Sequence, residues 1–158
     1  MTADNPKANK AAADATEKQF LLHQLYIKDF SFESPNSPEV FVNVGAEMET
    51  QMNIKNSHRE LDKHQVEVVL HLSVHAKRGE TTVFLIEIDQ AGIFEMKGFH
   101  KEELGQIIGT HCPATLFPYA REAISSAATR GGFPPLVLQP INFEALYAQS
   151  IQSGTPQA

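Results

Sequence analysis

The stretch from Phe20 to Pro35 limits the possible folds more than any other part of the chain. Its even-numbered positions are mainly aromatic, whereas its odd-numbered positions begin apolar and end acidic. Because successive side chains of a strand point to opposite faces, this pattern predicts one long β-strand with two different surfaces. A core needs only one of them. On the other surface we expect two halves. The apolar half, Leu21, Leu25 and Ile27, would serve self-association, and the acidic half, Asp29 and Glu33, would bind a basic partner.

Three further strands are expected after this one, each from an alternation of apolar and polar residues. They cover residues 40–54, 66–76 and 81–89. The polar residues 55–63 predict a loop before the third strand, and Gly79 suits a tight hairpin turn before the fourth.

Helical patterns begin only after residue 100. We expect a short helix at 101–108, a longer one at 118–129 and a last one at 143–152. Asn142 suits the N-cap of the last helix. If the long helix began at Pro113 instead, Pro118 would lie inside it and kink it. Strands followed by helices are typical of an α+β domain, in which helices pack on one face of an antiparallel sheet.

The composition predicts one folded domain with two disordered ends. The chain has 158 residues, of which 42% are hydrophobic and 20% charged, as in ordinary globular proteins. The first eighteen residues contain almost no large apolar side chains, which predicts disorder. We therefore expect a tail at 1–18, a domain at 19–152 and a second tail at 153–158.

The charge and the absence of apolar runs exclude several functions. The net charge of −6 argues against binding to nucleic acid or to an anionic membrane surface. No apolar run approaches the roughly 20 residues of a membrane span, and the N-terminus has no signal-peptide core. The single cysteine agrees with a reducing compartment. We therefore expect a cytoplasmic protein that is not inserted into the membrane.

No group of residues predicts a catalytic or metal site. His71 and His75 share a strand face, but about 13 Å of strand separates them, too far for one zinc ion. Cys112 could act as a nucleophile with His111 as its base, as in a thioesterase-like enzyme, but we favour a small semi-buried residue. The common nucleophile, phosphate and dinucleotide motifs are absent. We expect no enzymatic activity, metal or cofactor.

Three features indicate binding surfaces instead. The first is an outward acidic face that adds Glu47, Glu49, Glu67, Glu87 and Asp89 to the acids of the first strand, unless this is only a solvated face. The second is a stripe of small residues on the long helix, which suits either packing on the sheet or helix-to-helix assembly. The third is the segment 131–140, whose apolar residues either plug the core or form the wall of a groove.

Four segments form a set that is found together in one known family. They are YIKDFSFESP at 26–35, AGIF at 91–94, CPATLFPYARE at 112–122 and RGGFPPLVLQPINFEALY at 130–147. In this order they resemble SecB, a family of bacterial protein-export chaperones. The resemblance implies a homotetramer, a dimer of dimers, of four-stranded antiparallel sheets with two helices on one face. It also implies an ATP-independent holdase, without metal or cofactor, that binds unfolded precursor proteins and delivers them to the SecA motor.

The resemblance also assigns roles to individual positions. The contacts with SecA fall on Asp29, Glu33, Leu85 and Glu87. The client groove, chosen by apolarity and position, comprises Phe41, Val44, Phe133, Leu136, Leu138, Phe143, Leu146 and Tyr147. The subunit interfaces comprise Leu21, Leu25, Ile27, Ile86, Ile88, Ala120, Ala123 and Ala127. The C-terminus departs from the family because it lacks an acidic tail, and a dedicated antitoxin chaperone of the same fold is the closest alternative.

Overall fold

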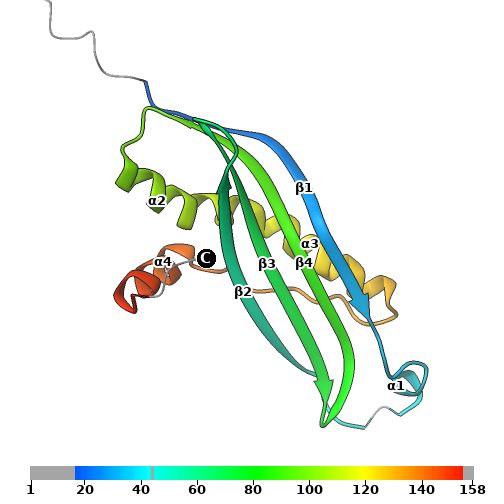
Figure 1. The fold of residues 1–158 in the computed structure, drawn as a ribbon. Helices are drawn as coiled ribbons and strands as arrows, with labels where there is room; N and C mark the ends of the chain where they lie inside the picture. The colour runs from blue at the N-terminus through cyan, green and yellow to red at the C-terminus, as the bar shows by residue number, and fades with distance from the viewer. Residues whose placement is uncertain (1–16, 44, 155–158) are drawn as a thin grey trace, which may run out of the picture.

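A four-stranded antiparallel sheet in the order β1-β4-β3-β2 forms the body of the molecule, and helices cover one of its faces (Figure 1). The computed structural model describes residues 17–43 and 45–154. Most of the predicted tails, at 1–16 and 155–158, and the groove residue Val44 lie outside this part of the chain. The elements are β1 (Gln19–Glu33), α1 (Glu39–Val42), β2 (Glu49–Glu60), β3 (Gln65–Arg78), β4 (Thr81–Lys97), α2 (Lys101–Gly109), α3 (His111–Arg130) and α4 (Phe143–Gln152).

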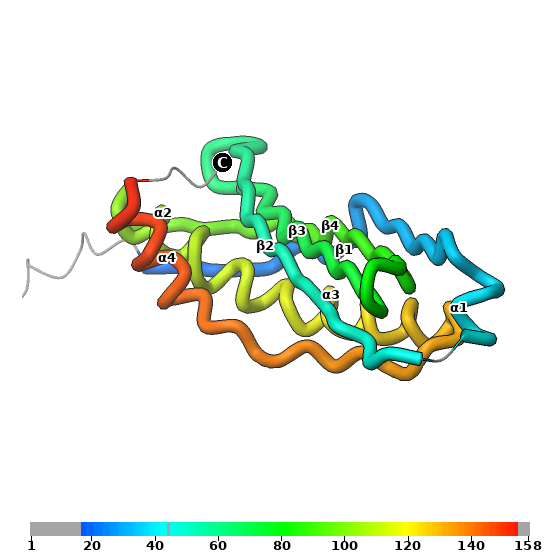
Figure 2. The backbone as a smooth tube through the Cα atoms, turned by 90° about the horizontal axis from the view of Figure 1, so that it is seen from below, coloured from blue at the N-terminus to red at the C-terminus, as the bar shows by residue number. Residues whose placement is uncertain are grey.

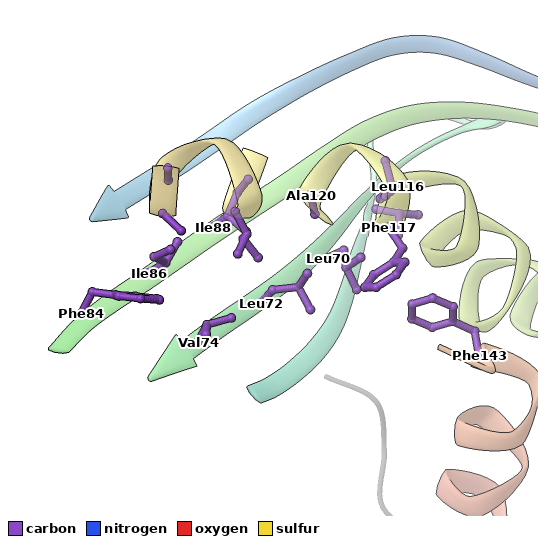
Figure 3. Packing of buried hydrophobic residues seen from close by; sticks show 14 of the residues in the cluster. Leu70, Leu72, Val74, Phe84, Ile86, Ile88, Leu116, Phe117, Ala120 and Phe143 are labelled. Atoms are coloured by element: carbon purple, nitrogen blue, oxygen red, sulfur yellow. The ribbon is translucent and has the colours of Figure 1, made fainter. Parts of the chain in front are cut away.

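The core lies between α3 and the inner face of the sheet. Side chains of β3 and β4 point toward α3 and lose all contact with solvent (Figure 3). Burial of such apolar side chains is the main favourable term in folding. Residues 131–142 then run beside α3 on the same side of the sheet and lead to α4 (Figure 2). The inner residues labelled in Figure 3 include Leu70, Leu72, Val74, Phe84, Ile86, Ile88, Leu116 and Ala120.

The second strand differs from its prediction at both ends. Residues 40–42 belong to the one-turn helix α1, and β2 continues through most of the predicted loop to Glu60. The inward positions of this end include Asn56 and His58, so the stretch carries no apolar alternation. It forms a strand because it pairs along its length with residues 66–70 of β3, all but one of which are buried. Tertiary pairing overrides the local pattern here.

The helical half is close to expectation, with one extension. Asn142 caps α4 as predicted, because its Oδ1 accepts a hydrogen bond of 3.0 Å from the amide of Ala145. The long helix begins at His111 and therefore contains Pro118, which corresponds to the alternative start. The structure thus has α2 and α4 beside α3, more than the two helices that the resemblance implied. Gly79 adopts a φ of 58° in the predicted hairpin turn.

Two β-bulges change the two faces of β1. Its register against β4 shifts between Leu22 and Gln24 and again between Ile27 and Asp29. Each bulge inserts one extra residue and so exchanges the faces of the residues that follow. Consequently, between the two bulges the odd-numbered residues of 24–27 face inward and the even-numbered residues face outward, the opposite of simple alternation. The inner residues of β1, which pair with even-numbered residues of β4, are Phe20, Leu22, Leu25, Ile27, Phe30 and Phe32.

Candidate functional site

The four predicted SecA-contact residues lie together on the outer face of the sheet. Glu33 pairs with Leu85 across β1 and β4, and Ser31 pairs with Glu87 in the same register. Directly opposite residues of antiparallel strands share a face, so these side chains and Asp29 form one surface. The three carboxylates are exposed and Leu85 is half-buried. This surface, which we call the acidic face, lies on the side of the sheet opposite α3.

Asp89 belongs to the acidic face as well, although it was not among the predicted contact residues. It pairs directly with Asp29, and such like charges repel each other. His71 of β3 offsets this repulsion, because its Nδ1 lies 2.5 Å from Asp89 Oδ1. Beyond His71 the next residue in the row is Lys55 of β2. The negative charge is therefore concentrated on β1 and β4, and alternation along the fourth strand had already indicated that Asp89 points outward.

Glu67 lies on the same side of the sheet but is not part of an exposed acidic surface. It is only 6% exposed. Its carboxylate accepts hydrogen bonds from the hydroxyl of Tyr26 and from Lys28 Nζ, the latter at 2.9 Å, and Arg59 Nη2 lies 3.6 Å away. The hydrogen bonds from Tyr26 and Lys28 lower the pKa of Glu67 despite its burial. Glu67 therefore faces outward as expected, but it is paired and nearly buried and adds no exposed charge to the acidic face.

The predicted groove residues divide into core and surface. Phe133 is buried in an aromatic cluster, with ring centroids 5.0 Å from both Phe41 and Phe84. Phe143 is buried against Phe117 at 5.9 Å. The prediction that Phe133 and Phe143 line an open groove is wrong, because both rings complete the core. Phe41 and Leu146 are exposed, whereas Leu136, Leu138 and Tyr147 are half-buried.

Two grooves lie along the helical side and at the end of the sheet. A depression of about 490 Å³ separates α3 from Val137, which is 70% exposed. A larger one of about 810 Å³ is lined by α1, the following loop and the β3–β4 hairpin. Arg78 borders the larger groove and donates a hydrogen bond of 2.8 Å to the carbonyl of Val40. Both grooves mix apolar and charged walls, which suits irregular polypeptide segments better than one small molecule.

Half of the eight predicted interface residues belong to the core of the chain. Four of them are at most 8% exposed and cannot form a subunit interface, so that prediction is wrong for Ile86, Ile88, Ala120 and Ala127. Ala123 is half-buried. The bulges also separate Leu21, on the outer face, from Leu25 and Ile27, on the inner face. Ile27 nevertheless remains 51% exposed at the sheet edge, beside Leu22 and Phe30 on the same inner face.

The residues considered for chemistry are not arranged for it. Burial raises the pKa of the Cys112 thiol to about 12, which disfavours the reactive thiolate. The ring of His111 stacks edge-on against Phe20 at 4.8 Å. Within residues 17–43 and 45–154, no three His, Cys, Asp or Glu side chains are grouped to hold a metal ion. Among the helices in that part of the chain, none is long and apolar enough to cross a membrane.

Known proteins match this chain along almost its whole length. The family model described as preprotein translocase subunit SecB matches residues 13–154. The protein-export protein SecB of Nitrosococcus oceani is 43% identical over 152 residues, which cover 95% of this chain and 92% of the relative. That of Methylococcus capsulatus is 46% identical over 142 residues, or 90% and 91% of the two chains.

A solved structure has the same fold. It is a SecB-like chaperone of Mycobacterium tuberculosis in complex with a peptide from an antitoxin. The TM-score is 0.64 with 16% identity, and the match covers 77% of this chain and 90% of the other. At this identity the likeness concerns the fold, whereas the family match and the sequence relatives establish the membership. The chain therefore belongs to the SecB family of chaperones, which hold precursor polypeptides for protein export.

Proposed function

We propose that this export chaperone uses separate surfaces for its two kinds of partner. The acidic face docks on SecA, and apolar side chains on the opposite side of the sheet hold the unfolded precursor. The register of β1 against β4 is the observation that carries the proposal, because it groups Asp29, Glu33, Leu85 and Glu87 on one exposed surface. No helix within residues 17–43 and 45–154 covers that surface, so docking and client binding need not compete.

Docking through the acidic face should be weak per contact and sensitive to salt. An exposed ion pair contributes about 0–1 kcal/mol, and salt screens it over roughly 8 Å at physiological ionic strength. Several carboxylates on adjacent strands still produce a local field that steers a basic segment toward the surface. Half-buried Leu85 adds an apolar contact among these charges. The arrangement favours a reversible attachment over a permanent one.

Client binding would rest on exposed apolar side chains around residues 131–142, α4 and the end of the sheet. Each Å² of apolar surface removed from water contributes about 25 cal/mol, so one side chain binds weakly. Several such sites on one long chain give tight binding through effective concentration. A folded protein hides these segments, which explains selectivity for unfolded chains. The exposed residues of this surface are Phe41, Val42, Met52, Val137, Leu146 and Ile151.

Self-association as a homotetramer, a dimer of dimers, is part of the proposal. The sheet edge at β1 carries the exposed inner residues Leu22, Ile27 and Phe30, with exposed Tyr119 of α3 on the same side of the sheet. Exposed apolar rows at a strand edge favour association with a second chain. The solution mass should be near four times 17.5 kDa. Ile27→Lys should lower that mass, whereas Val137→Lys should not.

The holdase activity is tested on a precursor that refolds spontaneously, in the absence of ATP. The chaperone should slow refolding at stoichiometric concentration, and Val137→Ser with Ile151→Ser should weaken this effect. Substitution of Cys112 by Ala should leave it unchanged. No slowing by the natural protein would contradict the holdase proposal, and dependence on Cys112 would favour the enzyme alternative instead.

The docking surface is tested by reversing its charges together. The variant Asp29→Lys, Glu33→Lys, Glu87→Lys should bind SecA at least roughly tenfold more weakly at low salt, because three attractions become repulsions. Client binding and solution mass should persist. The matched control reverses three exposed acids away from the acidic face: Glu17→Lys, Glu60→Lys and Glu102→Lys. Equal losses in both variants would show that only net charge matters. The assay uses a buffer that imitates the conditions of the cytoplasm, because the cytoplasm is the proposed location of the protein.

A further inference from the structure

Each of the two bulges in β1 is tied to a carboxylate of another strand. The extra residues are His23 and Lys28, which have no partner in the register against β4. His23 Nε2 lies 2.6 Å from Glu95 Oε2 of β4. Lys28 Nζ lies 2.9 Å from Glu67 Oε1 of β3, across the intervening strand.

Around the second bulge, Glu67 of β3 contacts side chains of both β1 and β2. Tyr26, two residues before Lys28, donates a hydrogen bond from its hydroxyl to the same carboxylate, and Arg59 Nη2 of β2 lies 3.6 Å from Glu67 Oε1. Gln90 Nε2 of β4 donates a hydrogen bond of 3.1 Å to the carbonyl of Tyr26. The segment around Lys28 is therefore held on the outer face of the sheet by Glu67 and on the inner face by Gln90, neither of which belongs to β1. Glu67 is the central acceptor, and its side chain is nearly buried.

The position of this bulge decides which residues reach the acidic face. Residues after it pair as Asp29 with Asp89, Phe30 with Ile88 and Ser31 with Glu87. If the bulge closed, the chain after it would move by one position against β4. Asp29 would then lie opposite inward-facing Ile88, and Phe30 would lie opposite outward-facing Glu87. A one-residue slip moves every side chain to the other face of the sheet.

We propose that Glu67 is a positioning residue, which holds the Lys28 bulge and thereby presents Asp29 and Glu33 on the acidic face. It touches neither SecA nor a client in this scheme. The role of these carboxylates in binding SecA rests on the docking function proposed above. The role of Glu67 in fixing the register of β1 is independent of that function. The ring of Phe32 packs against that of Phe84, with 6.1 Å between the centroids, and this contact also opposes the one-residue slip. Loss of Glu67 therefore shifts only part of the population to the other register.

Disulfide formation distinguishes the two registers. Directly opposite residues of antiparallel strands have Cα atoms about 4.5–5.5 Å apart, within the range that a disulfide spans. Ser31→Cys with Glu87→Cys therefore reports the native register, and Phe30→Cys with Glu87→Cys reports the shifted one. Cys112 is buried and does not interfere. Each pair is oxidised in the full-length chain with Glu67, and again with Glu67→Leu.

We expect Glu67→Leu to raise the yield of the 30–87 disulfide several-fold relative to the 31–87 disulfide. Glu67→Gln should have a smaller effect, because its amide oxygen still accepts from Lys28. Glu95→Gln is the matched control, since it alters the contact at the first bulge and should leave this ratio unchanged. An unchanged ratio in Glu67→Leu overturns the proposal. If that variant does not fold, an unchanged ratio in Glu67→Gln overturns it equally.

Binding to SecA is measured in the same series without the added cysteines. Glu67→Leu should weaken binding roughly fivefold to tenfold, and should have no further effect once Asp29→Asn and Glu33→Gln are present. A further loss in that background would mean that Glu67 does not act through these carboxylates. If the natural chain does not bind SecA at all, the docking proposal fails, and the disulfide ratio still decides the role of Glu67.

Discussion

The inner and outer faces of the sheet are made from the same four strands but are stabilised differently. On the inner face, Leu72 and Ile86 are apolar and without solvent exposure. On the outer face, the carboxylates of Glu67 and Asp89 accept hydrogen bonds from side chains of other strands. Burial is non-directional and additive over area, whereas paired charges contribute little where water reaches them. Stability therefore resides mainly on the inner face, and the outer face retains charges that remain available to a partner.

The largest contrast between the faces is expected at two adjacent residues of β4. Phe84 is fully buried, with its ring near Phe32 and Phe133, so Phe84→Ala should lower the unfolding free energy by about 3–5 kcal/mol. Leu85→Ala on the outer face should lower it by about 1 kcal/mol. Urea unfolding at one fixed protein concentration measures both, because assembly makes stability depend on concentration. Similar losses would show that the outer face also contributes to the core.

This contrast also explains how much of the fold the sequence could predict. The strands at 66–76 and 81–89 alternate strictly, and the structure contains both as parts of β3 and β4. The first strand alternates with interruptions at Gln24 and Lys28, two polar residues on a supposed core face. Spacing its apolar residues by two and three in turn gives an inner face without polar residues. The spacing of the apolar residues in the first strand therefore indicates the two bulges, but an assumption of strict alternation misses them.

The candidate site was predictable only in its outer half. Exposed carboxylates on strands follow from alternation, which places Asp29 and Glu87 correctly. The groove residues Phe133 and Phe143 are apolar residues next to prolines or helix ends, and local sequence does not distinguish a core plug from a groove wall. Their burial depends on Phe84 and Phe117, which are distant in sequence. Such contacts become visible only when the tertiary structure is known.

The second prediction tests the border of the inner face, where α3 ends. A Cβ at Gly131 would lie 2.2 Å from the ring of Phe32, which is fixed between other aromatic rings. Gly131→Ala should therefore lower the unfolding free energy by about 1–3 kcal/mol through overpacking. Gly45→Ala is the control, because its Cβ would meet nothing within 4 Å. Thermal unfolding compares the two, and an equal effect would mean that backbone freedom matters here more than packing.

The third prediction concerns the buried part of the outer face. Burial, together with the hydrogen bond to Glu67 and its negative charge, raises the pKa of Tyr26 to about 12. The stability that this phenol contributes is therefore complete below its ordinary pKa of about 10 and is lost as pH rises toward 12. Tyr26→Phe should lower the unfolding free energy at neutral pH by about 1 kcal/mol.

Tyrosinate absorbance after rapid pH jumps checks this assignment. The tyrosinate signal that develops near pH 12 should disappear in Tyr26→Phe. The steep loss of stability between pH 10 and 12 should also become shallower. If the late titration remained in the variant, Tyr26 would not be the buried phenol, and the network around Glu67 would be open to solvent.

The smallest effect is expected where two carboxylates of the acidic face oppose each other. Asp29 is exposed and directly opposite Asp89, so Asp29→Asn removes a repulsion and should raise the unfolding free energy by about 0.2–0.5 kcal/mol at low salt. Asp89→Asn should lower it, because His71 loses a charged partner. Urea midpoints at low and high salt measure both, and the gain at Asp29 should vanish with screening. A loss at both positions would give Asp29 a structural role. Opposite signs would mean that the chain retains Asp29 at a small cost in stability, as expected for a residue that serves a partner.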